Sequence, residues 1–253
     1  MLFPIGDDDR ELSKPAYITI LLVVANIVLF LLQLADPGLT YGWSVVPAEI
    51  STGQDMVGAT EVVTDQGAVT IPQAPGPTPI YLTLLFAMFL HGGFAHLLGN
   101  MLYLWIFGDN VEHRFGSLAF IFLYLGTGLM ASLAHIAVDP NSPVPSLGAS
   151  GAISGVLGAY LVLFPRNRVH AVILYSVVSI PAIAAIGIWI VFQFINGLGA
   201  IASTSQTGGV AYAAHIGGFF SGVILALILR ALIREEKPSV LTRAESLDSR
   251  RWW

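Results

Sequence analysis

The chain has 253 residues, of which 55% are hydrophobic and only 11% are charged, and its mean hydropathy is +0.75. This composition indicates a polytopic membrane protein and excludes an ordinary soluble domain. A formal net charge of −5 suggests no nucleic-acid partner, and the lack of cysteine excludes disulfides, thiolate nucleophiles and cysteine-ligated metals.

Six apolar runs carry few or no charged residues, and each predicts a membrane-spanning helix. They cover residues 16–35, 94–107, 118–138, 149–164, 182–199 and 210–233. The apolar stretch 80–90 is expected to extend the second span at its outer end. The predicted fold is therefore an all-α polytopic membrane protein, a bundle of six transmembrane helices.

The distribution of charge sets the expected orientation. If both termini are cytoplasmic, all eleven lysines and arginines fall on the cytoplasmic side. The expected organisation is a cytoplasmic segment 1–15, a membrane domain 16–233 with a long outer loop 36–79, and a disordered cytoplasmic tail 234–253. In the outer loop, Asp65-Gln66-Gly67 predicts a small hairpin over residues 61–70.

A serine at the start of the fourth span is the first candidate functional residue. Ser150 opens a helix in which Gly151, Ser154, Gly155 and Gly158 form a stripe of small side chains. At a helix N-terminus the backbone N–H groups are unpaired and the dipole is positive, which suits a developing oxyanion. The simpler interpretation is a packing face with a capping serine.

The length of this span favours the functional interpretation. Its 16 residues reach roughly 24 Å at about 1.5 Å per residue, short of the ~30 Å hydrocarbon core. Arg166 and Arg168 hold the inner end at the cytoplasmic surface, so Ser150 is expected below the outer surface. Irregular backbone at that depth needs protein or a water-filled cavity around it. Ser150 is therefore a candidate nucleophile at the floor of a wet cavity.

A serine nucleophile needs a base, and the spans contain no Asp or Glu. His215 lies about five residues into the sixth span, at a depth comparable to that of Ser150. Gly218 and Gly222 follow at i+3 and i+7, so two small-residue faces can pack backbone to backbone and bring His215 to Ser150. The alternative is a histidine bonded to a backbone carbonyl between helices.

The second span carries a further polar pair. His96 and Asn100 lie one turn apart on one helix face. Asn100 and the Ser150 backbone N–H can stabilise an oxyanion, and His96 can add a second donor. The alternative is that the pair only holds helices together. No metal site is expected, because His91 and His96 are five residues apart with no glutamate between them. Asp109, Glu112 and Arg114, just after this span, are expected to clamp the inner loop.

Together these motifs resemble the rhomboid family of intramembrane serine proteases, in its bacterial six-span form. The resemblance runs from about residue 16 to 233. It is carried by His91 with His96-Leu-Leu-Gly-Asn100, Glu112-His-Arg114-Phe-Gly116, Gly148-Ala149-Ser150-Gly151, and Ala214-His215-Ile216-Gly217-Gly218 with Gly222.

The resemblance implies a Ser150–His215 dyad, an oxyanion hole of Asn100, His96 and the Ser150 amide, and a supporting role for His91. It implies no cofactor and no metal. The glycines expected to pack closely are Gly148, Gly151, Gly155, Gly218 and Gly222. Two departures stand out. Many members carry an aromatic residue four positions after the nucleophile, where this chain has Ser154, and a Trp-Arg pair in the first outer loop, where this chain has Trp43 and no arginine.

The function expected is a serine endopeptidase that cleaves single-span or polytopic membrane proteins near the outer face of the plasma membrane. Its partners are thus membrane-protein substrates and the lipid bilayer, with an active site that opens to the extracytoplasmic side. The main alternative is a catalytically silent rhomboid-like protein that binds membrane clients. A small-solute transporter with Ser150 and Asn100 in its pathway is a third reading, disfavoured because no repeat symmetry is evident.

Overall fold

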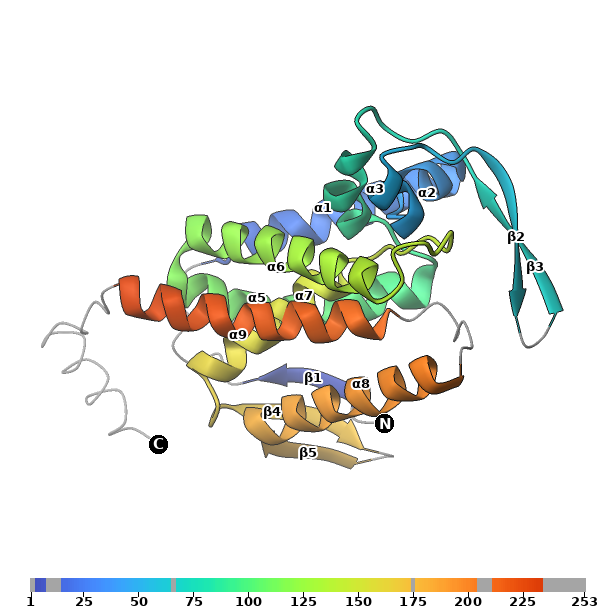
Figure 1. Cartoon of the computed structure of the whole chain (residues 1–253). Coiled ribbons are helices and arrows are strands. Elements are labelled where there is room, and N and C mark those ends of the chain that lie inside the picture. Colours follow the sequence, from blue (N-terminus) through green and yellow to red (C-terminus); the bar gives the residue numbers. More distant parts are fainter. Residues whose placement is uncertain (1–2, 8–14, 65–66, 174–175, 204–210, 234–253) are drawn as a thin grey trace, which may run out of the picture.

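The computed structural model describes residues 3–7, 15–64, 67–173, 176–203 and 211–233 (Figure 1). This part of the chain is mostly helical. Long helices running side by side form its body: α1 (Tyr17–Ala35), α5 (Phe94–Phe115), α6 (Ser117–Val138), α7 (Ser150–Leu163), α8 (Ala182–Ser203) and α9 (Tyr212–Leu232). Short helical segments lie between α1 and α5: α2 (Gly38–Trp43), α3 (Pro47–Thr52), η1 (Ile80–Leu82), α4 (Thr83–Phe86) and η2 (Ala87–Phe89).

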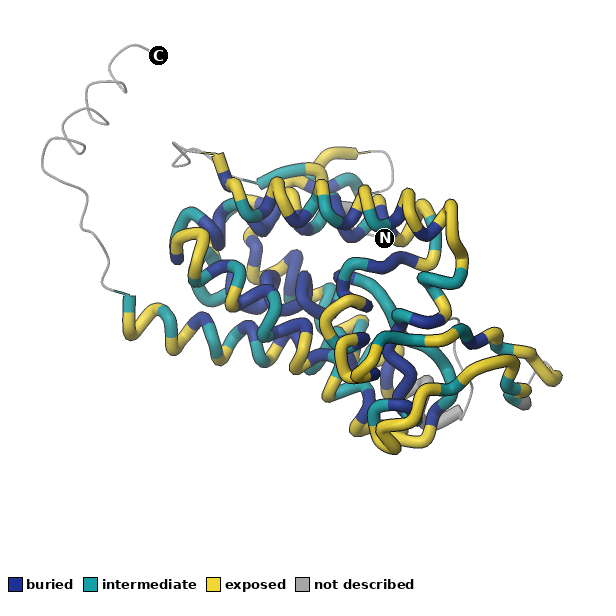
Figure 2. Tube along the Cα trace, turned by 90° about the horizontal axis from the view of Figure 1, so that it is seen from above, coloured by how far each residue is buried: buried dark blue, intermediate teal, exposed yellow. Residues whose placement is uncertain are grey.

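The helices have the surface of a membrane protein. In the described residues, α1, α6 and α9 are long and apolar enough to cross a bilayer, and a fourth span results if Ile80–Phe89 and Phe94–Phe115 are counted as one bent unit. Helices α7 and α8 are apolar, but their described apolar stretches are shorter. The outer faces of the bundle are exposed (Figure 2) and carry large apolar side chains such as Leu118, Phe122 and Leu232. Such faces suit contact with lipid tails, so the chain is a multi-pass membrane protein.

Helix α7 is the centre of the bundle. Every residue from Gly151 to Tyr160 is buried, because α5, α6 and α9 all pack against it. A helix that is apolar on all sides is stable only when it is enclosed in this way. Its 14 residues reach about 21 Å, so its ends cannot both reach the surfaces of a ~30 Å hydrocarbon layer.

Glycines let α7 and α9 touch through their backbones. A side-chain carbon on Gly218 would overlap the carbonyl oxygen of Gly151, and one on Gly222 would overlap that of Gly155. Gly151 has no room either, since a Cβ there would lie 2.6 Å from the Cβ of Ala131 on α6. Small residues thus set the spacing of α7 and α9, and this spacing fixes which side chains meet at their outer ends.

The expectation of an all-α fold needs a correction, because the described residues include two small sheets, of which only the outer-loop hairpin was expected. Strand β1 (Phe3–Asp7) pairs antiparallel with β4 (Arg168–Ile173), which pairs with β5 (Ser176–Pro181). In the N-terminal segment expected to be cytoplasmic, Asp7 accepts hydrogen bonds from Tyr160 and Asn110 of the helical core. This sheet was not predicted from the sequence because its strands are short. In addition, β1 and β4 lie about 160 residues apart, so no local sequence pattern indicates their pairing.

The second sheet is the hairpin expected in the outer loop. Strands β2 (Gly58–Thr64) and β3 (Gly67–Gln73) pair antiparallel, with Glu61 opposite Thr70. The hairpin projects from the bundle beside α2 and α3 (Figure 1). Trp43 at the end of α2 packs edge-to-face on Phe86, with ring centroids 4.8 Å apart.

Two expectations about the second span also change. The segment Ile80–Phe89 does not extend it in line, because it is bent by 77° relative to Phe94–Phe115. The helix continues to Phe115, so Glu112 belongs to α5 and is buried. Its carboxylate accepts hydrogen bonds from the Ile18 and Thr19 N–H groups and the Ser117 hydroxyl. Glu112 is therefore a clamp on the turn into α6, as expected, and it also holds the start of α1. The expected tail 234–253 lies outside the described residues.

Candidate active site

Ser150 is presented at the start of α7 by a fixed turn. Gly148 has φ +123°, a conformation that glycine adopts readily, and its N–H donates to the Ala87 carbonyl at 2.8 Å. Upstream, Val45 and Ser146 exchange backbone hydrogen bonds. In the described structure no side chain caps α7. The loop is therefore held in place, and the first N–H groups of α7 face the space next to Ser150.

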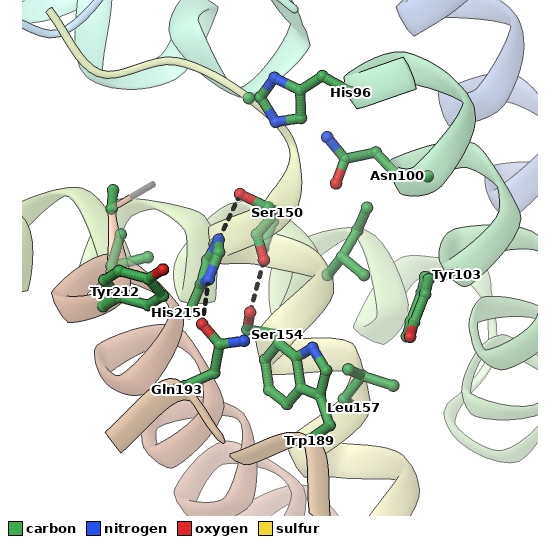
Figure 3. Close-up of a pocket in the computed structure, with 18 of the residues that line it drawn as sticks. His96, Asn100, Tyr103, Ser150, Ser154, Leu157, Trp189, Gln193, Tyr212 and His215 are labelled. Carbon is green, nitrogen blue, oxygen red and sulfur yellow. Dashed lines mark hydrogen bonds between the residues drawn. The ribbon is translucent and has the colours of Figure 1, made fainter. Parts of the chain in front are cut away.

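His215 of α9 meets Ser150 directly. The imidazole Nε2 lies 2.8 Å from the Ser150 Oγ (Figure 3). Both side chains are only partly buried, so they border open space. This is the distance at which a histidine can take a proton from a hydroxyl. The structure thus brings together the two residues that the sequence analysis singled out.

The other imidazole nitrogen is also bonded, to a residue that the sequence analysis did not identify. The Nδ1 of His215 lies 2.8 Å from the Gln193 amide oxygen, on α8. One turn earlier, Trp189 stands against the same imidazole, with ring centroids 6.1 Å apart and planes inclined by 38°. The signal available in the sequence was a glutamine within an apolar span, where polar side chains usually have a function.

Asn100 and His96 of α5 lie across from Ser150 (Figure 3). A Cβ on Gly148 would lie 2.9 Å from His96 Nε2 and 3.8 Å from Asn100 Nδ2, so both side chains approach the backbone just before Ser150. Asn100 is buried, and its Nδ2 has no hydrogen-bond partner among the described residues. An unpaired buried donor is costly in the absence of a ligand. The Asn100 amide is therefore available to an acceptor in this space.

The tautomer of His96 follows from its neighbour. The Gly92 N–H donates to His96 Nδ1 at 3.3 Å. Because an N–H can only donate, Nδ1 is the acceptor and Nε2 carries the proton of the neutral ring. His96 therefore offers an N–H donor beside Gly148, close to that of Asn100.

His91 stands behind His96 and does not touch Ser150. It is buried, and its ring meets the His96 ring edge-to-face at 5.2 Å. Its ring nitrogens have no side-chain hydrogen-bond partner among the described residues. The backbone of His91 is held by Gln33 of α1, whose amide accepts from its N–H at 2.9 Å and donates to its carbonyl at 3.2 Å. Gln33, whose role was also not predicted from the sequence, thus stabilises the bend that leads into α5.

A cavity of about 950 Å³ joins these side chains. Ser150, His215, His96 and Asn100 line one part of it, and it continues between α5, α7 and α8 toward β1 and β4. Its lining is largely apolar with a few converging polar groups, as is usual for ligand sites. In the described residues, no cluster of histidine, aspartate and glutamate has the geometry of a metal site.

The fold and the site define a class: a multi-pass helical membrane protein with a paired serine and histidine on the wall of a partly open cavity. Comparison with known proteins gives the family. The protein-family model described as the Rhomboid domain matches residues 80–232, more than half of the chain. The chain therefore belongs to the rhomboid family of intramembrane proteases.

Individual relatives agree with this assignment. The chain is 32% identical over 167 residues to the mitochondrial Rhomboid protein 1 of Saccharomyces cerevisiae, covering 64% of the chain and 46% of the relative. It is 39% identical over 145 residues to Rhomboid protease GluP of Bacillus subtilis, covering 57% of the chain and 26% of the relative. It is 35% identical over 147 residues to RHOMBOID-like protein 4 of Arabidopsis thaliana, covering 58% of the chain and 33% of the relative. The chain thus spans less than half the length of these relatives.

Proposed function

We propose that the chain is an intramembrane serine endopeptidase with Ser150 as nucleophile and His215 as general base. The observation that carries the proposal is the 2.8 Å contact between Ser150 Oγ and His215 Nε2. It lies at the N-terminus of α7, where no side chain caps the first N–H groups. Membership of a protease family supports it. A hydroxyl paired with an imidazole in this way is the minimal apparatus for acyl transfer.

In the first half of the reaction, Ser150 Oγ attacks the carbonyl carbon of the scissile peptide while its proton passes to His215 Nε2. The negative charge moves to the substrate carbonyl oxygen. Asn100 Nδ2, His96 Nε2–H and the Ser150 N–H are the donors proposed to hold it. Removal of one such donor from an oxyanion hole typically costs roughly 10²–10³ in kcat.

The tetrahedral intermediate then collapses. The carbon–nitrogen bond breaks, and His215 returns the proton to the departing amine, which leaves an acyl ester on Ser150. A water molecule next attacks the ester and gives a proton to His215 Nε2, and Ser150 regains its proton as the acid product leaves. The cavity beside the pair supplies room for this water and for the substrate backbone.

The proposed topology has six spans, α1, α5, α6, α7, α8 and α9, with both termini cytoplasmic and the site open to the extracytoplasmic side of the plasma membrane. The short α7 supports this arrangement, because its outer end then lies below the surface, where a transmembrane substrate is cut. The site is walled by helices, so a substrate helix has to unwind locally to present its backbone. Single-span or polytopic membrane proteins are the proposed substrates.

Cleavage of a transmembrane reporter by the purified protein in proteoliposomes tests the proposal. Ser150→Ala is expected to abolish cleavage while the thermal unfolding midpoint stays near that of the wild type. Ser221→Ala is the matched control, because Ser221 lies on α9 with its hydroxyl bonded to the Gly218 carbonyl of its own helix. Equal cleavage by wild type and Ser150→Ala would refute the proposal. A folded wild-type protein that binds the reporter without cutting it would favour the catalytically silent alternative.

A further inference from the structure

We propose that Gln193 is a positioning residue of the Ser150–His215 pair. Its amide oxygen holds the histidine in the one tautomer that can act as a base toward Ser150, while Trp189 backs the ring. The inference rests on the proposed function and extends the pair to a chain of three side chains from three helices: α7, α9 and α8.

Hydrogen-bond chemistry fixes the tautomer. The amide oxygen of Gln193 can only accept, so the bond at 2.8 Å requires a proton on His215 Nδ1. In the neutral ring the lone pair then lies on Nε2, which faces the Ser150 hydroxyl at 2.8 Å. Without Gln193 the proton is free to move to Nε2, and that tautomer cannot accept the proton of Ser150.

The side chains around His215 explain why residues of α8 hold its ring. Ser154 is buried, and its hydroxyl donates to the Ser150 carbonyl at 2.6 Å within α7. Because the Ser154 side chain is small and bonded to its own backbone, it provides no ring surface against which the imidazole of His215 can pack. The ring contact comes instead from Trp189, and the polar contact from Gln193, one turn further along α8. Together they hold the imidazole from the side opposite Ser150 (Figure 3).

Helix α8 is anchored at its start by backbone hydrogen bonds to the segment that follows α7. The Ala182 N–H donates to the Asn167 carbonyl at 2.8 Å, and the Ile183 N–H donates to the Pro165 carbonyl at 3.1 Å. Strand β5 leads directly into this end of the helix and is paired with β4. The β sheet thus has a consequence for the site, because it anchors the helix that carries Trp189 and Gln193.

An uncharged amide suits the chemistry of this position. When His215 takes up the serine proton, its positive charge is shared with Nδ1–H, and the bond to the Gln193 oxygen becomes a stronger, charge-assisted one. The amide does not itself take the proton, so Nε2 keeps it for the leaving amine. A carboxylate at this position would stabilise the imidazolium further and make His215 harder to deprotonate at rest.

The test compares Gln193→Leu and Gln193→Glu with the wild type in the proteoliposome assay, across a range of pH. Gln193→Leu is expected to lower kcat roughly 10- to 100-fold with little change in KM, as for loss of a hydrogen bond to a charged group. Gln193→Glu is expected to move the acidic limb of the kcat profile to higher pH by about one unit or more. Other titratable groups near His215 are His96 on α5, His135 on α6 and Tyr212 on α9, and none of them is altered.

Gln54→Leu is the matched control, the same glutamine-to-leucine change at an exposed residue that does not line the cavity. It is expected to keep the wild-type profile. Wild-type kcat in Gln193→Leu would overturn the inference. If that variant does not fold, an unshifted acidic limb in Gln193→Glu would overturn it instead. Failure of the wild type to cleave at all would refute the proposed function, so the two failures are distinct.

Discussion

Replacing Gly222 by alanine probes the contact between α7 and α9 that brings the serine and the histidine together. A Cβ at this position would lie 2.6 Å from the Gly155 Cα and would overlap the Gly155 carbonyl oxygen, where 3.4–4 Å is ordinary contact. The two backbones must therefore separate by about 0.8 Å or more. If this separation reaches the pair, the 2.8 Å bond between Ser150 and His215 lengthens to about 3.6 Å, which no longer qualifies as a hydrogen bond.

We expect Gly222→Ala to lower reporter cleavage about 10²-fold and to destabilise the protein by about 1–3 kcal/mol. Cleavage in proteoliposomes and thermal unfolding in detergent measure the two effects. Gly187→Ala on α8 is the matched control, because a Cβ there meets no atom within 4 Å, so it should preserve activity and stability. Wild-type cleavage and stability in Gly222→Ala would show that the glycine contact does not position the pair.

Two further variants test the supports of the site and of the outer loop. Gln33→Leu leaves the buried N–H and carbonyl of His91 without partners. We therefore expect a loss of about 1–3 kcal/mol of stability per unpaired group and slower cleavage. An unchanged unfolding midpoint would contradict this expectation. Burial, with the nearby Asp55 charge, raises the pKa of the Glu49 carboxyl in α3 above its ordinary value. The folded state therefore holds this proton more tightly than the unfolded state, and stability falls as the pH rises above the ordinary carboxyl value. Glu49→Gln is expected to be more stable than the wild type at neutral pH and about equally stable in acid, where Glu49 is protonated. A stability difference between variant and wild type that does not vary with pH would show that the pKa of Glu49 is not raised by folding.

Much of the helical framework was accessible from the sequence, because lipid removes the option of unpaired backbone and forces long apolar runs into helices. The pairing of Ser150 with His215 could be anticipated for a related reason. Small residues at helical spacing on two spans specify a close backbone contact, and the depth of each polar residue then decides which side chains meet.

The features that escaped prediction are non-local or ambiguous. The pairing of Phe3–Asp7 with Arg168–Ile173 depends on contacts across most of the chain, which no window of sequence contains. The bend after Phe89 is maintained by Gln33 from another helix, so the apolar run by itself suggested continuity. Gln193 was overlooked because an amide in an apolar span has many possible partners, and only the folded arrangement selects His215.

Mapping the adduct of a fluorophosphonate probe by mass spectrometry shows whether Ser150 is the nucleophile and whether His215 activates it. We expect one modified residue, Ser150, in the folded wild-type protein, and loss of the adduct in His215→Ala, because the hydroxyl is a weak nucleophile without its base. A probe attached to another serine, or labelling of Ser150 at an unchanged rate in His215→Ala, would contradict it.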